Sequence, residues 1–589
     1  MLGERSDQRG LFEADHMYLE HVGRRSFYGF LASMRGKLFR DEEFADLYCA
    51  DNGRDSVPPS LLATALLLQT HDKVSDDEAK QRADFDIRWK VALGIDVEER
   101  PFAKSTLQLF RAHLVLHGKA RSVFQRSLRF ACQTGYVKSR RMKAALDTSY
   151  ILGRGAVKDT YNLLSDGIIQ VVRALAALEG RKAEVWARER GFERYFSSSV
   201  KGEASVNWDN EKARRVFLQG IVADADRVLE IARQSQAGEP EGSVRRQGII
   251  EAAGLLGQLL LQDVERKEDG AVIKEGVSRD RIVSVHDPEM RHGHKSSRKR
   301  FDGHKAAVAV DTDSQLITAV DVLPGNAPDN TGALELVEQS EENSGIEVKE
   351  TIGDCAYGDG GTRQAFAKAE RTLIAKVPGR PNKARFPKED FHIDLEAGTC
   401  TCPAGVVTRR VITATTRINH SGQACRVQGF HFHGATCRKC PLRDACVNAG
   451  NGKGRTVTLH PQEALLQQAR DFQKSEAFAE YRKRRQVSEH RFARLVQLGI
   501  RQARYFGRAK TLFQLLMAAT VANLTLVATK LGMMGKVDRP VTYFFAPFHQ
   551  GLAIAISTLA LKLFVVVVSL LAWPTERPCF AQAGFRPDF

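Results

Sequence analysis

The spacing of apolar residues divides the chain into helical and strand-forming regions. Over residues 10–130, apolar positions recur at helical spacing in PPSLLATALLLQTH, DEAKQRADFDIRWKVALG and STLQLFRAHLVLHG. Pro58 and Pro59 suit a first helical turn, and Ser105 is a good N-cap residue. The pattern therefore predicts an N-terminal helical domain over residues 1–135.

Three short helices in this region are open to two interpretations. One is a helix-turn-helix DNA-binding domain, in which residues 104–116 form the helix that enters the major groove. The other is a plain helical bundle, since patterns of three short helices are common. The sequence favours neither of the two.

Strand and helix patterns alternate in the middle of the chain. An apolar strand at 142–153 precedes a long helical insertion at about 160–280. Two strands, 305–311 and 316–322, are joined by a Thr-Asp-Ser-Gln turn and predict a hairpin. Helix, strand, helix and strand follow in NTGALELVEQSEENSG, VKETIGD, GGTRQAFAKAER and TLIAKV. This order predicts a mixed α/β core over residues 140–378, in which helices cover a mixed sheet.

The last third of the chain departs from this alternation. Residues 379–460 are rich in Cys, Gly, Thr and His, and helical spacing returns over 461–530. The tail, 531–589, contains the apolar run 551–573, which has the length of a membrane span. Lys562 lies near the middle of that run, where it would cost about 3 kcal/mol on insertion. We therefore expect an atypical extension, with membrane insertion as the less favoured alternative.

Composition adds a polyanionic partner to this picture. The chain has 589 residues, 43% of them apolar and 27% charged, which is typical of globular proteins. Lysine and arginine number 87 against 71 acidic residues, so the net charge is +16 and the pI about 9.4. Such an excess favours nucleic acid as the partner. The N-terminus lacks the pattern of a secretory signal, so we expect a cytoplasmic, nucleoid-associated protein.

Three carboxylates are candidates for a metal site. The stretch ETIGDCAYGD reads as a strand that ends on Asp354, beside small residues, and Asp147 ends the earlier strand. Neighbouring strands of one sheet can hold two such side chains together. Glu489, in a basic helix, is the third. Acids that converge without a basic partner repel one another unless divalent cations neutralise them. Two Mg²⁺ or Mn²⁺ ions would suit phosphodiester chemistry.

Other aspartates compete with these candidates. Asp302 lies in a basic loop, Asp311 and Asp313 flank the hairpin turn, and Asp359 closely follows Asp354. Aspartates in such positions more often form turns or are solvated charges. A role in a turn is also the alternative for Asp354 itself. Asp147 is preferred because it precedes the hairpin.

Several long motifs resemble one family of enzymes. ALDTSYILGRGAVKDTYNLLSDGI, DPEMRHGHKSSRKRFDGHKAAVAVDTDSQLITAVDVLPGNAPDN, IGDCAYGDGGTR and CRKCPLRDAC are similar to bacterial insertion-sequence transposases of the DDE type, in the insertion-sequence 1182 branch. The resemblance covers roughly residues 10–530. It implies a ribonuclease-H-like core, an N-terminal DNA-binding domain, and an insertion before the helix that bears the glutamate.

The resemblance also implies a reaction. A DNA transposase of this kind binds the terminal inverted repeats of its own element, cuts phosphodiester bonds and joins the exposed 3′-OH to target DNA, as a homo-oligomer on double-stranded DNA. Two alternatives stay open. One is a ribonuclease-H-like nuclease or junction-resolving enzyme without strand transfer, and the other is a catalytically inactive DNA-binding regulator.

The catalytic residues carry over by motif. Asp147 in ALDTS matches the first family aspartate, Asp354 in IGDCAYGD the second, and Glu489 in RRQVSEHRF the glutamate. Arg485 lies four residues before Glu489, on the same helical face, and is expected to hold a DNA phosphate. Its alternative role is that of a solvated cation.

One family position departs from the pattern. Related branches place a lysine two turns after the glutamate, but Val496 stands there. Arg491 or Arg494 would have to replace that lysine in positioning the transposon end.

A basic segment before the predicted hairpin is a second candidate for DNA contact. Its charges lie beside the expected active-site sheet, which favours phosphate binding over a merely solvated face. The expected DNA-binding residues, besides Arg485, are Arg291, Lys295, Arg298, Lys299, Arg300, His304 and Lys305.

The cysteines favour a metal rather than disulfides. Ten cysteines are too few and too clustered for a disulfide framework in a chain of this length. Cys437, Cys440 and Cys446, with Cys402, have spacing typical of a tetrahedral Zn²⁺ site, and Cys400 is left as a spare thiol. Free thiols or an iron–sulfur cluster are the alternatives.

Overall fold

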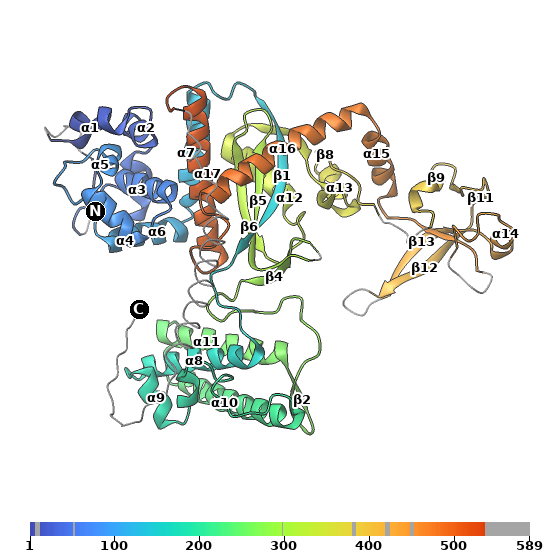
Figure 1. Ribbon diagram of the computed structural model, residues 1–589, viewed down its shortest axis with the longest axis horizontal. Helices are drawn as coiled ribbons and strands as arrows, with labels where there is room; N and C mark the ends of the chain where they lie inside the picture. Colours follow the sequence, from blue (N-terminus) through green and yellow to red (C-terminus); the bar gives the residue numbers. More distant parts are fainter. Residues whose placement is uncertain are drawn as a thin grey trace, which may run out of the picture. The chain divides into compact units, whose positions relative to one another are not determined.

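A computed structural model describes the chain over residues 1–5, 12–50, 53–296, 298–379, 385–418, 424–447 and 453–535 (Figure 1). The apolar run at 551–573 lies outside these residues. Over the described ranges the chain combines helices with strands, which confirms the mixed fold class.

The N-terminal part of the chain is helical. Its helices bury large side chains such as Phe30, Trp89 and Phe124 in one core. Ser26, Ser75 and Asp86 accept hydrogen bonds from backbone N–H groups in the first turns of the helices that follow them, as expected of N-caps. The elements are α1 (Ala14–Val22), α2 (Phe27–Ser33), the 3₁₀ turn η1 (Asp41–Leu47), α3 (Pro59–Asp72), α4 (Asp76–Phe85), α5 (Ile87–Leu93), α6 (Lys104–Leu116) and α7 (Ala120–Gln133).

The largest sheet of the described residues has six strands, and Figure 1 labels several of them. Its order is β4-β5-β1-β7-β8, and β6 pairs with β5 beside β4. β5 is antiparallel to β1, β4 and β6, whereas β7 is parallel to β1 and to β8. The strands are β1 (Arg141–Leu152), β4 (Arg291–His294), β5 (Arg300–Asp311), β6 (Ile317–Pro324), β7 (Glu347–Ile352) and β8 (Thr372–Ile374).

The predicted hairpin is present, as β5 and β6, but its first strand begins earlier than expected. The segment predicted as a basic loop contains β4 and the start of β5, which pair through Arg291 and Gly303. Charged residues at the edge of a sheet hide a strand from a search for apolar alternation, because that search relies on one face being buried.

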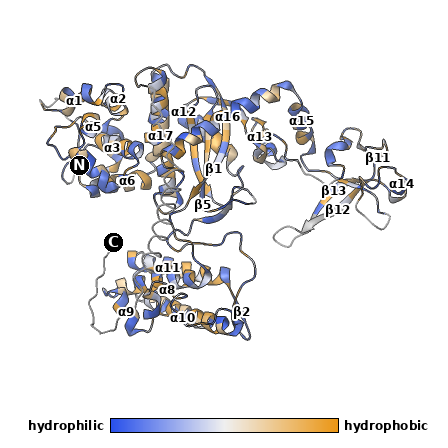
Figure 2. Ribbon diagram, in the orientation of Figure 1, coloured by the Kyte–Doolittle hydropathy of each residue, from blue (hydrophilic) through white to orange (hydrophobic). Residues whose placement is uncertain are grey.

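Helices cover both faces of this sheet. On one face, Met142, Ala144 and Leu146 of β1 pack with α12 (Ala333–Ser344) and α13 (Gly360–Lys368). On the other, Val308 and Val310 of β5 share a core with α16 (Glu476–Gln497) and α17 (Arg508–Lys530). Figure 2 shows hydrophobic residues along β1 and β5, as burial on both faces requires.

Among the described helices, α17 alone has the length and apolar composition of a membrane span. However, 83% of its most apolar window is buried inside the protein, against α3, α7 and β6. The buried side chain of Asn523 accepts a hydrogen bond from Ile317 N at 3.0 Å and donates one to Ile317 O at 2.8 Å. α17 is therefore a core helix that also completes the hydrogen bonding of β6.

Between β1 and β4 the chain forms a helical insertion with its own core. Trp186, Phe192 and Tyr195 are fully buried there. Tyr195 comes from a 3₁₀ turn, and the hairpin that closes the insertion adds Val264 and Ala271 to this core. The elements are α8 (Thr160–Leu178), α9 (Ala183–Glu189), η2 (Glu193–Phe196), α10 (Glu211–Ala237), α11 (Val244–Asp263), β2 (Val264–Lys267) and β3 (Gly270–Ile273).

The Cys-rich segment consists of two small sheets, followed by α15 (Glu463–Gln473) and α16. Phe391, Phe430, Phe432 and Cys400 form its core. The elements are η4 (Lys388–Asp390), β9 (His392–Asp394), β10 (Thr399–Thr401), β11 (Val407–Thr408), β12 (Val411–Ile418), β13 (Ala424–His431), α14 (Gly434–Arg438) and β14 (Thr456–Thr458).

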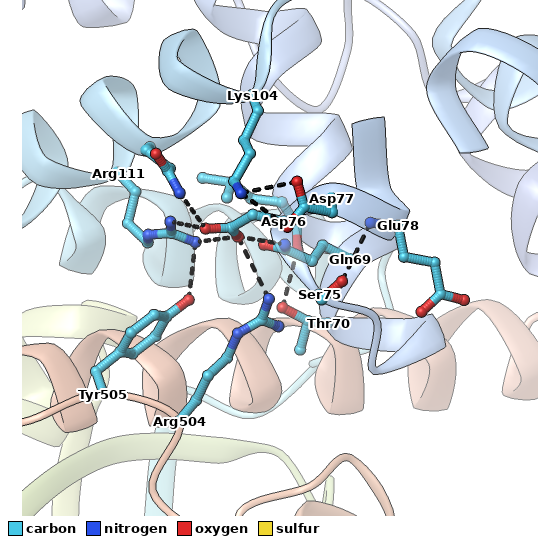
Figure 3. A network of polar contacts seen from close by, with 12 residues as sticks. Gln69, Thr70, Ser75, Asp76, Asp77, Glu78, Lys104, Arg111, Arg504 and Tyr505 are labelled. Atoms are coloured by element: carbon cyan, nitrogen blue, oxygen red, sulfur yellow. Dashed lines mark hydrogen bonds and ion pairs between the residues drawn. The ribbon is translucent and has the colours of Figure 1, made fainter. Parts of the chain in front are cut away.

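A half-buried aspartate joins the N-terminal helices to the segment before α17. Figure 3 shows Asp76, in the first turn of α4, between Arg111 of α6 and Arg504. Arg111 donates to both oxygens of Asp76, at 2.9 and 2.7 Å, and to Tyr505 Oη at 2.8 Å. Burial alone would raise the pKa of Asp76, but hydrogen bonds from Arg111, Gln108 and Gln69 outweigh it and lower that pKa.

These contacts bear on the predicted DNA-reading helix. In α6, Arg111 is paired with Asp76, and Lys104 is paired with Asp77 at 2.7 Å. The most exposed apolar side chains of this helix are Leu109 and Leu116. The exposed side of α6 is thus not a basic surface, and the helix-turn-helix interpretation stays a prediction.

Replacing Asp76 by Asn should destabilise the attachment of the N-terminal helices. The variant leaves Arg111 largely buried beside a neutral partner, which costs about 2 kcal/mol. Asp77→Asn is the matched control, because its ion pair with Lys104 is exposed and contributes less than about 0.5 kcal/mol. Scanning calorimetry should show a lower melting midpoint for the first variant only, and equal midpoints for both would contradict this account.

Candidate active site

Asp147 lies on β1, the central strand of the sheet. Its side chain is 18% exposed. Oδ1 accepts a hydrogen bond from Thr148 N at 2.9 Å, and Oδ2 accepts one from Ser488 Oγ of α16 at 3.1 Å. α16 therefore crosses the sheet directly at this carboxylate.

Asp354 follows β7, the strand parallel to β1. In their register Ala145 pairs with Ile352, so two residues further on Asp147 is level with Asp354. Asp354 Oδ1 accepts a hydrogen bond from Ala356 N at 2.8 Å and so caps the turn after the strand. A methyl group on Gly353 would lie 2.7 Å from Tyr357 Cβ, so this glycine makes room for a buried tyrosine rather than for a ligand.

Glu489 and Arg485 extend from the same face of α16. Arg485 Nη2 donates to Glu489 Oε1 at 2.5 Å, and its Nη1 lies 3.6 Å from Asp147 Oδ2. The three acids were expected to converge without a basic partner, and this prediction was wrong, because Arg485 pairs with two of them. The alternative of a solvated cation was also wrong, since the guanidinium is 24% exposed and paired twice.

Asp147, Asp354 and Glu489 line one cavity of about 690 Å³. Asp329 and Lys305 line it as well, and Lys305 Nζ lies 2.6 Å from Asp329 Oδ1. The oxygen atoms of the three predicted ligands do not all lie within 4.8 Å of one another; of the described acids, cysteines and histidines, only Glu13, Asp15 and His16 form such a group. A cation bound by all three would draw them closer together.

Burial is the main influence on the acidic groups of this cavity. Burial raises the pKa of Asp147 to about 6, and the charge of Asp354 adds to this effect, although Arg485 and the hydrogen bond from Ser488 oppose it. Burial also raises the pKa of Tyr357 well above its usual value, and the neighbouring charges of Asp147, Asp354 and Asp329 contribute. The carboxylate oxygens are hard ligands of the kind that suit Mg²⁺ or Mn²⁺.

The competing aspartates have local roles. Asp311 accepts hydrogen bonds from Ser314 N and Oγ in the hairpin turn, and Asp359 caps α13 through Gly361 N at 2.8 Å. Asp302 contacts His292, and Asp313 is exposed beside Arg484. None of these four lines the cavity that holds Asp147.

Three of the residues predicted to bind DNA are engaged within the protein. His304 was a wrong prediction, because it is fully buried with its Nε2 3.4 Å from Asp287 Oδ2. Arg291 folds back and donates to Pro288 O at 2.5 Å and to Met290 O at 2.8 Å. Lys305 is paired with Asp329, inside the cavity.

The rest of the basic segment is accessible. Lys295, Arg298, Lys299 and Arg300 are exposed, and Lys295 lines the cavity. The two arginines suggested as replacements for the missing family lysine differ in their exposure to solvent. Arg491 is 7% exposed, which excludes it from DNA contact, whereas Arg494 is half-buried; Val496 lines the cavity.

Sequence reasoning missed four residues of the site. Ser488 holds Asp147, Asp329 adds a fourth carboxylate, and Tyr150 and Arg501 line the cavity. No local pattern pointed to these residues, and Tyr150, three residues after Asp147, would be expected on the opposite face of the strand.

The predicted zinc ligands also share a cavity. Cys402, Cys437, Cys440 and Cys446 line a space of about 30 Å³, and Cys400 lies outside it. The donor atoms of no three of these thiols lie within 4.8 Å of one another. Burial raises the pKa of Cys400 to about 11, with the nearby Cys402 adding to the shift, so Cys400 remains a neutral thiol.

Two family models match the chain. Residues 401–528 match one described as transposase DDE domain, and residues 19–113 match one described as transposase domain (DUF772). No curated protein matches the chain. The first range includes Arg485 and Glu489, and the second includes α2 to α5. Together the matches support an insertion-sequence transposase and an enzyme of the transposase or nuclease type.

Replacing Asp147 by Asn should stabilise the metal-free protein in a pH-dependent way. The folded-state pKa of about 6 lies above the unfolded value of about 3.9, so the folded protein holds the proton more tightly and loses stability as pH rises between them. Asn removes this cost. In EDTA, the gain in melting midpoint over the unsubstituted protein should be larger at pH 7.5 than at pH 5.0, and an equal gain at both would contradict the shift.

Proposed function

We propose that the chain is a DNA transposase of the insertion-sequence 1182 branch, which cuts the ends of its own element and joins them to target DNA. The observation that carries the proposal is that Asp147, Asp354 and Glu489, from two parallel strands and a helix, line one cavity. The two matching transposase models support the same conclusion.

The central sheet is then a ribonuclease-H-like core. Its support is the strand arrangement: three antiparallel strands, β6, β5 and β1, are continued by the parallel strands β7 and β8. A parallel neighbour is what brings Asp354 level with Asp147, since Ala145 pairs with Ile352 and both chains run in the same direction from there. The helical insertion and the Cys-rich segment interrupt this core in sequence but not in its hydrogen bonding.

Asp147, Asp354 and Glu489 would hold the divalent cations. Mg²⁺ or Mn²⁺, when bound, would supply activation of the attacking oxygen and stabilisation of the leaving oxygen. Ser488 keeps Asp147 oriented through its hydrogen bond of 3.1 Å. Arg485 pairs with two of these acids, so it must release them when they take a cation, and a DNA phosphate is the natural new partner for a guanidinium.

The nucleophiles are water and then the freed 3′-OH, so no covalent link to the protein is required. The exposed charges of Lys295, Arg298, Lys299 and Arg300 would bind the phosphate backbone beside the acids. The substrate is double-stranded DNA: the terminal inverted repeats and the target. The N-terminal helical domain would contribute to binding the repeats, and the active species would be a homo-oligomer on the nucleoid.

A strand-transfer assay tests this function. With labelled terminal DNA and Mg²⁺, the unsubstituted protein should give cleaved ends and joined products. Asp147→Asn, Asp354→Asn and Glu489→Gln should each lower the yield about 10³-fold or more, because each removes a ligand of the reacting centre. Asp313→Asn, an exposed carboxylate outside the cavity, is the control and should change the yield less than about twofold.

Two outcomes would contradict the proposal. Nicked DNA without joined product would indicate a nuclease or junction-resolving enzyme. Unchanged mobility of the element in cells with Asp354→Asn would indicate a DNA-binding regulator instead.

We also propose that Cys402, Cys437, Cys440 and Cys446 bind a structural Zn²⁺. Support comes from the four thiols around one small cavity and from the turns that present them, in which Cys402 N donates to Val406 O at 2.9 Å and Gly405 N to Cys402 O at 2.8 Å.

Metal analysis of the purified protein tests the zinc site. We expect about one zinc per chain, as for a four-thiolate site. Cys437→Ser should abolish zinc binding, because three thiolates hold zinc more weakly than four. Cys400→Ser should retain the zinc, since the Cys400 thiol lies outside the cavity. Iron with visible absorption, or equal zinc loss in both variants, would contradict the assignment.

A further inference from the structure

Aromatic and basic side chains gather on the wall of the active-site cavity beyond the acids. We call this group the Tyr150 platform; it consists of Tyr150, Phe301, Lys295, Lys299 and Arg501. The ring centroids of Tyr150 and Phe301 are 5.3 Å apart. Arg501 Cζ lies 4.0 Å from the Tyr150 centroid, and the ammonium nitrogens of Lys299 and Lys295 lie 5.2 and 5.5 Å from it. Three cations thus surround one ring.

The platform is held in place by the sheet. Arg501 donates to Ser149 Oγ at 3.1 Å and to Tyr150 O at 2.9 Å, so its guanidinium is fixed beside the ring. Phe301, at the start of β5, is only 5% exposed and supports Tyr150, which is itself half-buried. Of the platform, all members except Lys299 line the cavity that contains the acids.

The positive charge of the platform is not neutralised by the protein. Within the described part of the chain, Lys295, Lys299 and Arg501 have no carboxylate within 4.0 Å, whereas Arg485 and Lys305, in the same cavity, are each paired with one or more acids. Three unpaired cations next to one another repel, so their arrangement fits a polyanionic ligand better than a purely structural role.

The platform lies next to the site of chemistry. Tyr150 follows Asp147 by three residues on β1, a distance of about 10 Å along an extended strand. In the antiparallel register Tyr150 pairs with Lys305, whose side chain reaches Asp329 in the same cavity. A nucleotide bound here would therefore be adjacent to a phosphate held at the acids.

The chemistry of the platform selects one form of DNA. In a paired duplex both faces of each base are covered by neighbouring bases, so a protein ring has no base face to contact. An unpaired or flipped base offers its face to an aromatic ring and to a planar guanidinium, while lysines hold its phosphate. A cavity of about 690 Å³ has room for one nucleotide.

We propose that the Tyr150 platform binds an unpaired nucleotide of the DNA end, next to the phosphate that is cut. The inference rests on the proposed function, because it specifies the form of DNA that the same cavity takes. Opening of the terminal base pair is then part of binding, and the protein recognises ends that open more readily.

Binding in EDTA, where no cleavage occurs, tests the platform. The probes are two duplexes of one sequence with terminal 2-aminopurine, either paired or left unpaired by removal of the opposite nucleotide. The full-length protein should bind the unpaired probe about tenfold more tightly and quench its fluorescence, as stacking requires. Tyr150→Ala should reduce this preference to less than about twofold, and Tyr150→Phe, which keeps the ring, should retain it.

The outcomes separate the platform from the proposed function. Equal binding of the two probes by the unsubstituted protein, or a full preference in Tyr150→Ala, would overturn the platform even if strand transfer occurs. A preference that depends on the ring would support the platform even if no joined product forms. Quenching in the unsubstituted protein is read without any variant, so a Tyr150→Ala protein that fails to fold does not remove the test.

Discussion

The ion pairs of Arg485 are the interaction on which the active site depends. Three elements far apart in the sequence bring Asp147, Asp354 and Glu489 to one cavity, and like charges at close range oppose such an arrangement. Arg485 lies within ion-pair distance of two of them, from the same helix that carries Glu489. The sheet fixes the first two acids, and a single guanidinium makes the approach of the third favourable.

Under the proposed function, the same arrangement makes cation binding and DNA binding dependent on each other. Carboxylates that Arg485 already neutralises attract a divalent ion less strongly, and an arginine that two acids hold is less free for a phosphate. A phosphate at the site would draw Arg485 away and expose the acids, while a cation would repel the guanidinium toward the phosphate. Each ligand therefore favours the other, without any movement of the sheet.

The sequence predicted the site residues whose position depends on the order of the strands. It did not predict which side chains pair with one another. The alternation of strands and helices predicted that Asp147 and Asp354 belong to neighbouring strands, and their level positions follow from the parallel register. The prediction that the first strand ends on Asp147 was wrong, because β1 continues to Leu152 in its pairing with β5. His304 failed as a DNA ligand because a histidine within a basic run looks exposed, and its burial against Asp287 depends on a segment beyond the helical insertion. The pairing of Arg485 with Asp147 likewise joins residues 338 positions apart by number, which no local pattern reveals.

The cavity is divided along β1 into regions of opposite charge. Asp147 and its acidic neighbours lie at one point of the strand, and Tyr150 with its unpaired cations lies three residues further on. A nucleic-acid strand needs both, since a scissile phosphate requires cations that carboxylates can hold, and the adjacent phosphate requires direct positive charge. The acids and the platform are about 10 Å apart along β1, because each residue of an extended strand adds a nearly constant rise. A loop would not fix this distance as closely.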